Sequence, residues 1–512
     1  MGSRARLVFR NTGWSAISQI TFIAIKFISI PLVLHHFGKE QYGIIVVVTA
    51  LSGFLQLLSA GLPVGIVRHA AGWIAEEQWD MLRRGVRTSL SLFSILGLVN
   101  VAILVGIVLF GYRAFHVPPE SLTEFKLMVM AAAAASILYW YFCVADQLLV
   151  AFEDVAWLSR MIALPALLDL GWILVVRRYD LPFHVYYWGQ LLTMLTPIPL
   201  KLWRLRRHIN LVAHLRPGWF WADCHDMFRF SLGLFSIAMS QNAVNQLRPI
   251  VLGMRAGTGM IAAAEFRVLF QVTQVLFLMK SWFSDPLLPT MTKAVARNDH
   301  RFVERTAYAM TRLAWVITVF PVVMIAVCAK DILQVYVGNQ GDTLHVWLSF
   351  WMLAFIGSYL APISSIVVAK GLLGPLVRFT GIAAVCTILL YWFLAPTLNV
   401  GATVVGNVMF SLAHIVFYHA YMLKKIGLQP GRLFREAFIG PFIIAAVVGA
   451  AVSLMLMQIP DWSSWWRLGA AGIFGGLLYG TLILTWIIKP AECRRYYEMI
   501  RQGNPAGEPE IS

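Results

Sequence analysis

The sequence predicts an all-α polytopic membrane protein with about 14 transmembrane helices, and three observations support this fold class. Of the 512 residues, 59% are hydrophobic and 13% are charged, which is more apolar surface than a water-soluble fold can bury. The apolar residues form continuous runs, whereas the strands of a membrane barrel alternate every second residue. Basic residues gather in alternate connections between these runs. The composition also excludes a disordered chain.

Each helix that crosses the hydrocarbon core needs about 20 mostly apolar residues. Fourteen windows meet this requirement: 12–34, 44–66, 88–110, 126–150, 157–176, 183–203, 231–254, 261–285, 310–329, 345–369, 376–395, 401–423, 438–457 and 468–488. The first window is too long for a signal peptide and lacks a small-residue cleavage site. We therefore expect it to remain in the protein as the first helix.

The distribution of lysine and arginine predicts the orientation. With residue 1 inside, the loops on the cytoplasmic side carry 29 of the 41 basic residues and the opposite loops carry seven. Basic residues favour the cytoplasmic side of a membrane protein, so both termini are expected there, which requires an even number of helices. Arg177 and Arg178 depart from this pattern at the fifth and sixth windows. The same asymmetry accounts for the net charge of +16 without nucleic acid as a partner.

A weak internal repeat predicts two related halves. Residues 28–34, followed by Gly38, have a counterpart in residues 247–252, followed by Gly257. Repeated halves around a site near the membrane midplane are a common transporter plan. We expect two pseudo-symmetric six-helix bundles, two additional helices and a cytoplasmic tail, at 1–210, 211–425, 426–490 and 491–512.

Polar side chains recur at helical spacing inside several windows. Hydrogen bonds between helices, worth about 0.6 kcal/mol each, explain many serines and threonines, but a charge deep in a span indicates function. Four cations lie at such depth, against few acids, and this surplus suits an anionic ligand such as a phosphate. The cations are Lys26, Arg248, Arg267 and Lys280.

Three acids are candidates for ion coupling: Glu265, Asp169 and Asp285. Glu265 is expected to neutralise Arg267 or Lys280, or to carry a proton. Asp285 precedes Pro286 and is expected to end its helix. For Asp169 the sequence favours no single role.

Motifs of enzyme chemistry are absent from the sequence. It contains no HExxH, GxxxxGK[ST], GxSxG or GxGxxG pattern, and its five cysteines form no CxxC pair. We expect no catalytic residue, no metal and no cofactor. Without a nucleotide site, transport would be driven by an ion gradient, of H⁺ or Na⁺, or by a substrate gradient.

The N-terminal segment carries a family resemblance. Asn11, Pro31, the G-x-x-x-Y-G pattern of residues 38–43 and the Ala60-Gly61-Leu62 segment resemble the polysaccharide-exporter family. That family contains the O-antigen and related lipid-linked oligosaccharide flippases, within the superfamily that also holds multidrug exporters and lipid II flippases. Two positions depart from the family: Ala60 stands where an acid is common, and Phe266 where a tyrosine is common.

The resemblance implies a flippase of the bacterial inner membrane. Its cargo would be an anionic lipid, an oligosaccharide linked to undecaprenyl diphosphate, with a polysaccharide polymerase as a partner. In such proteins cavity cations hold the diphosphate, a role that Lys26 and Arg248 fit, with Arg267 and Lys280 behind them. The expected sugar contacts are Gln19, Gln56, Asn242 and Asn245. The alternatives are an exporter of small cationic drugs, a membrane glycosyltransferase, ligase or polymerase, and a scaffold.

Overall fold

The computed structural model describes residues 2–54, 62–284, 287–338 and 343–487. Every regular element in these residues is a helix, in agreement with the predicted fold class. The chain divides into two compact units. Unit 1 comprises Met1–Gln274 and Gly374–Asn407, and unit 2 comprises Val275–Leu373 and Val408–Ser512. These limits differ from the expected boundaries at 210 and 425, so the repeat of two six-helix bundles stays a prediction.

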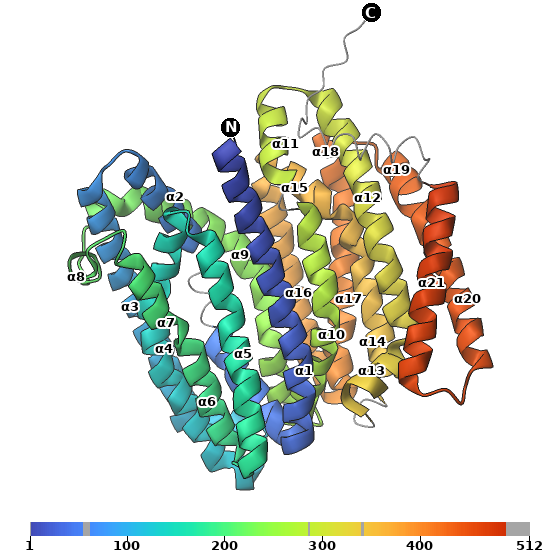
Figure 1. The fold of residues 1–512 in the computed structure, drawn as a ribbon, viewed down its shortest axis with the longest axis horizontal. Coiled ribbons are helices and arrows are strands. Elements are labelled where there is room, and N and C mark those ends of the chain that lie inside the picture. The colour runs from blue at the N-terminus through green and yellow to red at the C-terminus, as the bar shows by residue number, and fades with distance from the viewer. Residues whose placement is uncertain (1, 55–61, 285–286, 339–342, 488–512) are drawn as a thin grey trace, which may run out of the picture. The chain divides into compact units, whose positions relative to one another are not determined.

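Unit 1 is built from long helices (Figure 1). In chain order they are α1 (Gly2–Phe54), α2 (Leu62–Ala75), α3 (Trp79–Leu109), α4 (Leu122–Ala151), α5 (Val155–Tyr179), α6 (Phe183–Leu195), α7 (Pro197–Leu205), α8 (Leu211–His214), α9 (Trp221–Arg255), most of α10 (Met260–Ser284), α16 (Leu373–Leu398) and the start of α17 (Val400–Phe417). Short 3₁₀ turns, η2 (Gly111–Ala114) and η3 (Pro119–Ser121), connect α3 to α4.

Unit 2 is arranged around α12. Its elements are α11 (Leu287–Ala296), α12 (His300–Val327), α13 (Ala329–Val337), α14 (His345–Trp351), η5 (Met352–Leu360), α15 (Ala361–Ala369), η6 (Tyr418–Met422), α18 (Leu423–Ile426), α19 (Pro430–Leu433), η7 (Phe434–Ile439), α20 (Gly440–Gln458) and α21 (Ser464–Trp486). Trp315 of α12 stacks on Phe438, at 5.1 Å between ring centroids. The hydroxyl of Tyr479 donates to the Val316 carbonyl at 2.6 Å, which ties α21 to α12.

Among the described residues, eleven helices are long and apolar enough to cross a membrane, so the protein is a multi-pass membrane protein. Three differences separate this number from fourteen. The first window and the start of the second fall in α1, which is interrupted at Gly38 but counts as one candidate span, and the sixth breaks at Thr196 between α6 and α7. The seventh lies in α9, which is not among the eleven. The count of fourteen therefore stays a prediction.

Connections that were predicted to share a side of the membrane meet at the same end of unit 1. At one end Arg84 contacts Asp223 at 2.9 Å, and Arg204 contacts Asp154 at 2.6 Å. At the other end the Thr258 amide donates to Asn399 Oδ1 at 2.9 Å. Each of these contacts joins two connections that the sequence placed on the same side of the membrane. Which end faces the cytoplasm stays a prediction.

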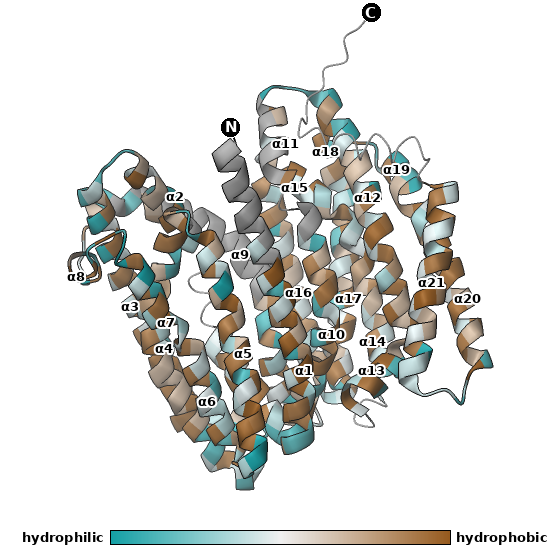
Figure 2. Cartoon of the chain, in the orientation of Figure 1, coloured by the Kyte–Doolittle hydropathy of each residue, from teal (hydrophilic) through white to brown (hydrophobic). Residues whose placement is uncertain are grey.

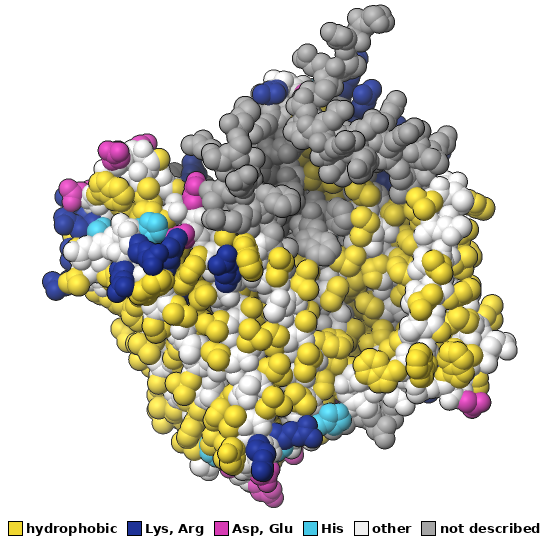
Figure 3. Space-filling view, in the orientation of Figure 1, with side chains coloured by type: hydrophobic (Ala, Val, Ile, Leu, Met, Phe, Trp, Pro, Cys, Tyr) yellow, Lys and Arg dark blue, Asp and Glu magenta, His cyan; other side chains and the backbone are white. Residues whose placement is uncertain are grey.

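The outward face of α5 and α6 is apolar. Leu167, Leu174 and Leu192 are all more than half exposed. Figure 2 shows hydrophobic residues along the middle of these helices and hydrophilic residues near their ends. In Figure 3 the hydrophobic side chains form a band between lysine and arginine residues. This distribution suits contact with lipid, because apolar side chains then face hydrocarbon and charges reach the headgroups.

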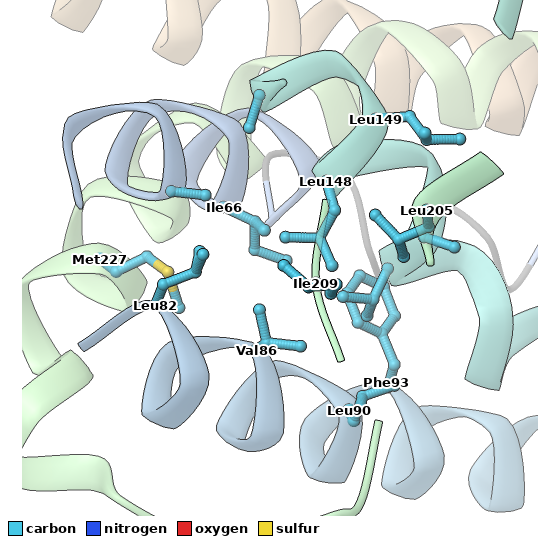
Figure 4. Close-up of a cluster of buried hydrophobic side chains, with 14 of the residues drawn as sticks. Ile66, Leu82, Val86, Leu90, Phe93, Leu148, Leu149, Leu205, Ile209 and Met227 are labelled. Carbon is cyan, nitrogen blue, oxygen red and sulfur yellow. The ribbon is translucent and has the colours of Figure 1, made fainter. Parts of the chain in front are cut away.

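A buried apolar cluster fixes the end of unit 1 that holds Asp154 (Figure 4). It joins α2, α3, α4, α7 and α9, through residues that are at most 7% exposed, among them Ile66, Leu82, Val86, Leu90, Phe93, Leu148, Leu149, Leu205, Ile209 and Met227. Burying one such side chain is worth about 1.5–3 kcal/mol in water. The cluster holds these five helices together at that end of the unit.

Candidate functional site

The G-x-x-x-Y-G segment shapes the end of α1. Gly38 has φ +79° and ψ 173°, a backbone conformation that interrupts the helix and favours glycine. Five residues later the backbone of α1 touches the start of α10: a Cβ on Gly43 would lie 1.9 Å from the Met260 carbonyl oxygen. Between these glycines, Tyr42 is only 5% exposed. The two glycines thus allow a break and a close contact, which together direct Tyr42 inward.

Lys26 and Asp169 form a buried ion pair between α1 and α5. The Lys26 ammonium lies 2.6 Å from Asp169 Oδ2, and the Tyr186 hydroxyl on α6 donates to Asp169 Oδ1 at 3.2 Å. The Asp169 side chain is 2% exposed and that of Lys26 is 16% exposed. Asp169 precedes the end of α5 by ten residues, about 15 Å along the helix. The pair therefore lies deep within the predicted span.

Arg267 joins this group from α10. Its guanidinium lies near the hydroxyl of Tyr42, and Tyr42 in turn lies near Asp169. No carboxylate lies within 4 Å of Arg267 among the described residues. The Phe270 ring lies beneath the guanidinium at 5.7 Å. We call Lys26, Tyr42, Asp169, Tyr186 and Arg267 the inner cluster.

Glu265 has a different partner from those expected. Its carboxylate lies 3.1 Å from the ammonium of Lys39, and the two side chains are 14% and 26% exposed. The reason is the break at Gly38, which brings the next residue, Lys39, to the start of α10. Within unit 1, Glu265 thus neutralises a cation of the connecting segment, while Arg267 turns toward Tyr42.

Arg248 is almost completely buried, at 1% exposure. Its Nε donates to the Tyr391 hydroxyl at 3.1 Å and its Nη2 donates to Asn407 Oδ1 at 2.5 Å. The Phe266 ring lies 5.8 Å from the guanidinium. Arg248 therefore connects α9 to α16 and α17 within unit 1, and its side chain is a structural link as well as a charge.

The structure brings only some of the predicted site residues together. Lys26, Asp169 and Arg267 meet in the inner cluster. The Arg248 guanidinium contacts the ring of Phe266, which directly precedes Arg267 in the sequence. Gln19 is exposed on α1 and Asn245 is half-buried on α9, whereas Lys280 belongs to unit 2. Three further predictions, Gln56, Asp285 and the side chain of Asn242, lie outside the described residues.

Sequence reasoning missed the two tyrosines of the inner cluster. Tyr42 and Tyr186 are 5% and 2% exposed, and each contacts a charged group. A signal existed for Tyr42, because it is part of the G-x-x-x-Y-G pattern. Gln271 lies one helical turn after Arg267 on α10. It is fully buried, and its Nε2 donates to the Ile23 carbonyl of α1 at 3.3 Å.

No protein-family model and no curated protein matches this sequence. Solved structures do match its fold. The lipid II flippase MurJ in an inward closed conformation has a TM-score of 0.66 at 11% identity, over 95% of this chain and 99% of that chain. An inward-facing multidrug resistance MATE family transporter of the MOP superfamily has a TM-score of 0.57 at 16% identity, over 80% and 99%.

A MOP superfamily transporter from Pyrococcus furiosus, whose binding pocket is described as having reverse polarity, has a TM-score of 0.51 at 15% identity. The match covers 91% of this chain and 95% of that chain. Likeness at such identities shows a shared fold. The chain thus has the fold of the MOP superfamily transporters that it matches.

Proposed function

We propose that the protein is a flippase for a lipid-linked oligosaccharide in the bacterial inner membrane. It would move an undecaprenyl-diphosphate-linked oligosaccharide from the cytoplasmic to the periplasmic leaflet by alternating access, for surface polysaccharide synthesis. The observation that carries the proposal is Arg267, a half-buried cation on α10 that has no carboxylate partner among the described residues. A charge at such depth in a membrane protein needs a counter-charge, and a phosphate of the cargo would supply it.

The local charge supports an anionic cargo. Among the residues that the structure describes in this part of unit 1, two carboxylates, Asp169 and Glu265, stand against four cations: Lys26, Lys39, Arg248 and Arg267. Guanidinium groups bind phosphate oxygens through two parallel hydrogen bonds, which a lysine does not offer. We therefore assign the first phosphate contact to Arg267, with Lys26 as the second cation. Arg248 would act mainly by holding its helices in place.

Several finer assignments belong to the same proposal. Gln19, Gln56, Asn242 and Asn245 would contact sugar, and Lys280, in the part of α10 that belongs to unit 2, would be a further cation for the cargo. Glu265, Asp169 and Asp285 are the candidate acids for coupling to H⁺ or Na⁺. A polysaccharide polymerase would receive the cargo at the periplasmic side.

An exporter of small cationic drugs is the second candidate, because MATE family transporters share the fold. Such a protein needs a carboxylate that is accessible to a cation. Asp169 is the most buried acid that the structure describes in unit 1, and its carboxylate already forms an ion pair with the Lys26 ammonium at 2.6 Å. The resident lysine thus fills the place that a cationic drug would take, which favours an anionic cargo.

Lipid mass spectrometry on a deletion strain tests the proposal, together with a stain for surface polysaccharide. We expect the polymer to disappear and the intact lipid-linked oligosaccharide to accumulate in the membrane. A deletion strain that carries Arg267→Gln should give the same result, whereas one that carries Arg267→Lys should export part of the polymer. Loss of both polymer and lipid precursor would indicate an assembly enzyme instead. Normal amounts of both would contradict the flippase and favour the drug exporter.

A further inference from the structure

The Lys26–Asp169 pair has an asymmetric environment. Asp169 is enclosed, with an exposed fraction of 2%, and both of its oxygens accept a hydrogen bond, from Lys26 and from Tyr186. The Lys26 side chain is 16% exposed and its ammonium carries three donors. Lys26 is therefore the more accessible of the two groups, and an anion that approaches the pair would meet the ammonium before the carboxylate.

We infer that Asp169 is a resident counter-anion for Lys26, that a phosphate of the cargo displaces it, and that Asp169 then takes up one proton. This inference rests on the proposed function, because it requires a cargo with a phosphate headgroup. In the empty carrier, the Asp169 carboxylate pairs with the Lys26 ammonium until the cargo binds.

Electrostatics explains why Asp169 would take up a proton when a phosphate binds Lys26. Breaking a buried ion pair leaves an uncompensated charge, at a cost of about 3–5 kcal/mol when one partner is removed. A phosphate bound to Lys26 would also place a second negative charge beside Asp169, and like charges favour protonation of a carboxylate. A protonated Asp169 is neutral and can still share a hydrogen bond with Tyr186, whose oxygen accepts as well as donates.

The other charged and titratable neighbours of Asp169 are few. Tyr186 on α6 hydrogen-bonds Asp169, and Tyr42 on α1 and Arg267 on α10 lie near this group. No hydrogen bond or ion pair reaches Asp169 from α4 or α7 in the described part of the chain. A phosphate that binds Lys26 and Arg267 together would bring its negative charge beside Asp169, so anion binding and proton uptake reinforce each other.

Calorimetry on the full-length protein in detergent tests the inference. Farnesyl diphosphate serves as the probe, and its binding is measured in buffers of different ionisation enthalpy, which reports the number of protons exchanged. For the wild type we expect uptake of about one proton for each ligand bound. Asp169→Asn should bind the probe about tenfold more tightly, since the competing anion is gone, and should take up no proton. Asp146→Asn, which removes the carboxylate of another Lys–Asp pair (2.8 Å to Lys201), should behave as the wild type.

Infrared difference spectroscopy gives a second measurement that depends on no destabilising variant. Adding the probe to the wild type should produce the band of a protonated carboxyl group, and Asp169→Glu should shift that band. Binding without proton uptake and without the band would overturn the inference and leave the proposed function standing. Proton uptake that persists in a folded Asp169→Asn would also overturn it. A folded wild type that binds no diphosphate probe would contradict the proposed function itself, and the inference with it.

Discussion

The ammonium of Lys26 and the carboxylate of Asp169 lie 2.6 Å apart, between α1 and α5, although 143 positions separate them in the sequence. The pair ties the first helix to the fifth at mid-depth. It also neutralises Lys26 in the empty protein, so the electrostatic attraction for an anion in the inner cluster comes mainly from Arg267. The pair thus serves both the packing of unit 1 and the charge balance of its candidate site.

A double-mutant cycle on Lys26 and Asp169 should show strong coupling in stability. Lys26→Gln or Asp169→Asn alone leaves a buried charge without its partner, and we expect each to cost about 3–5 kcal/mol. The double variant should regain much of this loss, because neither charge remains. The midpoint of thermal unfolding in detergent measures the effect. Additive losses in the two single variants would show that the two groups do not interact.

Lys26→Glu should abolish export of the surface polymer. The substitution places two carboxylates together beside Tyr186 and removes a cation from the anionic site. Complementation of a deletion strain, with immunoblots to confirm equal protein levels, measures the effect. Lys26→Arg is the matched control and should retain export. Wild-type export from Lys26→Glu would exclude Lys26 from the site.

Arg267→Gln should lower export about 10–100-fold without unfolding the protein. A hydrogen bond to a charged group is worth about 1.5–3 kcal/mol, which corresponds to this range. The substitution removes the charge but leaves a polar side chain near Tyr42. Tyr42→Phe is a useful comparison, since it removes the hydroxyl and keeps the cation. If both variants export normally, the phosphate contact lies elsewhere.

The sequence predicted the helices and their polar faces well, because a run of apolar residues and a spacing of three or four are local properties. Lys26, Arg248 and Arg267 were all found in this way. The groups that contact these cations in the structure were not predicted. Lys39 and Glu265 lie 226 positions apart, and nothing local to either residue indicates the contact, which depends on the break at Gly38 and on the packing of α1 against α10.

The role of Arg248 shows a second limit. Its position inside a predicted span indicated a cavity, since a guanidinium cannot face lipid at that depth. The structure satisfies the same requirement with Tyr391 and Asn407 instead. A sequence reveals that a buried charge needs partners, but protein groups and a ligand meet this need equally well. Tertiary contacts alone distinguish the two cases.

Gly43→Ala should destabilise unit 1 strongly. The added methyl group would lie 1.9 Å from the Met260 carbonyl oxygen, and backbone cannot move aside as a flexible side chain can. The matched control is Gly171→Ala in α5, where nothing lies within 4 Å of the new Cβ and helix propensity rises. The midpoint of thermal unfolding should fall for the first variant and hold or rise for the second. Equal midpoints would show that α1 and α10 separate easily.

Low pH should weaken the contact between the α4–α5 connection and α7. Asp154 accepts hydrogen bonds from Arg204 at 2.9 and 2.6 Å and from His208 at 2.7 Å. Partial burial raises the pKa of Asp154, but these hydrogen bonds outweigh it and hold the pKa below its ordinary value of 3.8. The unfolded chain then binds the proton more readily. The contribution of Asp154 to stability is therefore complete above pH 3.8 and is lost as the pH falls through the lower folded value.

Thermal unfolding as a function of pH measures this contribution. Below about pH 5 the wild type should lose stability more steeply than Asp154→Asn, which has no carboxylate to protonate. Asp80→Asn, in an exposed pair with Arg83, should retain the slope of the wild type. Parallel curves for the wild type and Asp154→Asn would contradict the assignment.

Arg248→Lys should destabilise the link between α9 and the α16–α17 segment, although it preserves the charge. A lysine has no planar fork of donors and cannot serve Tyr391 and Asn407 in the same geometry. Losing both hydrogen bonds in a site that is 1% exposed should cost about 3 kcal/mol. Tyr391→Phe removes one of the two bonds and should cost about 1 kcal/mol. If Arg248→Lys instead lowers binding of a diphosphate probe with no change in the midpoint of thermal unfolding, Arg248 contacts the cargo directly and its role as a structural link is excluded.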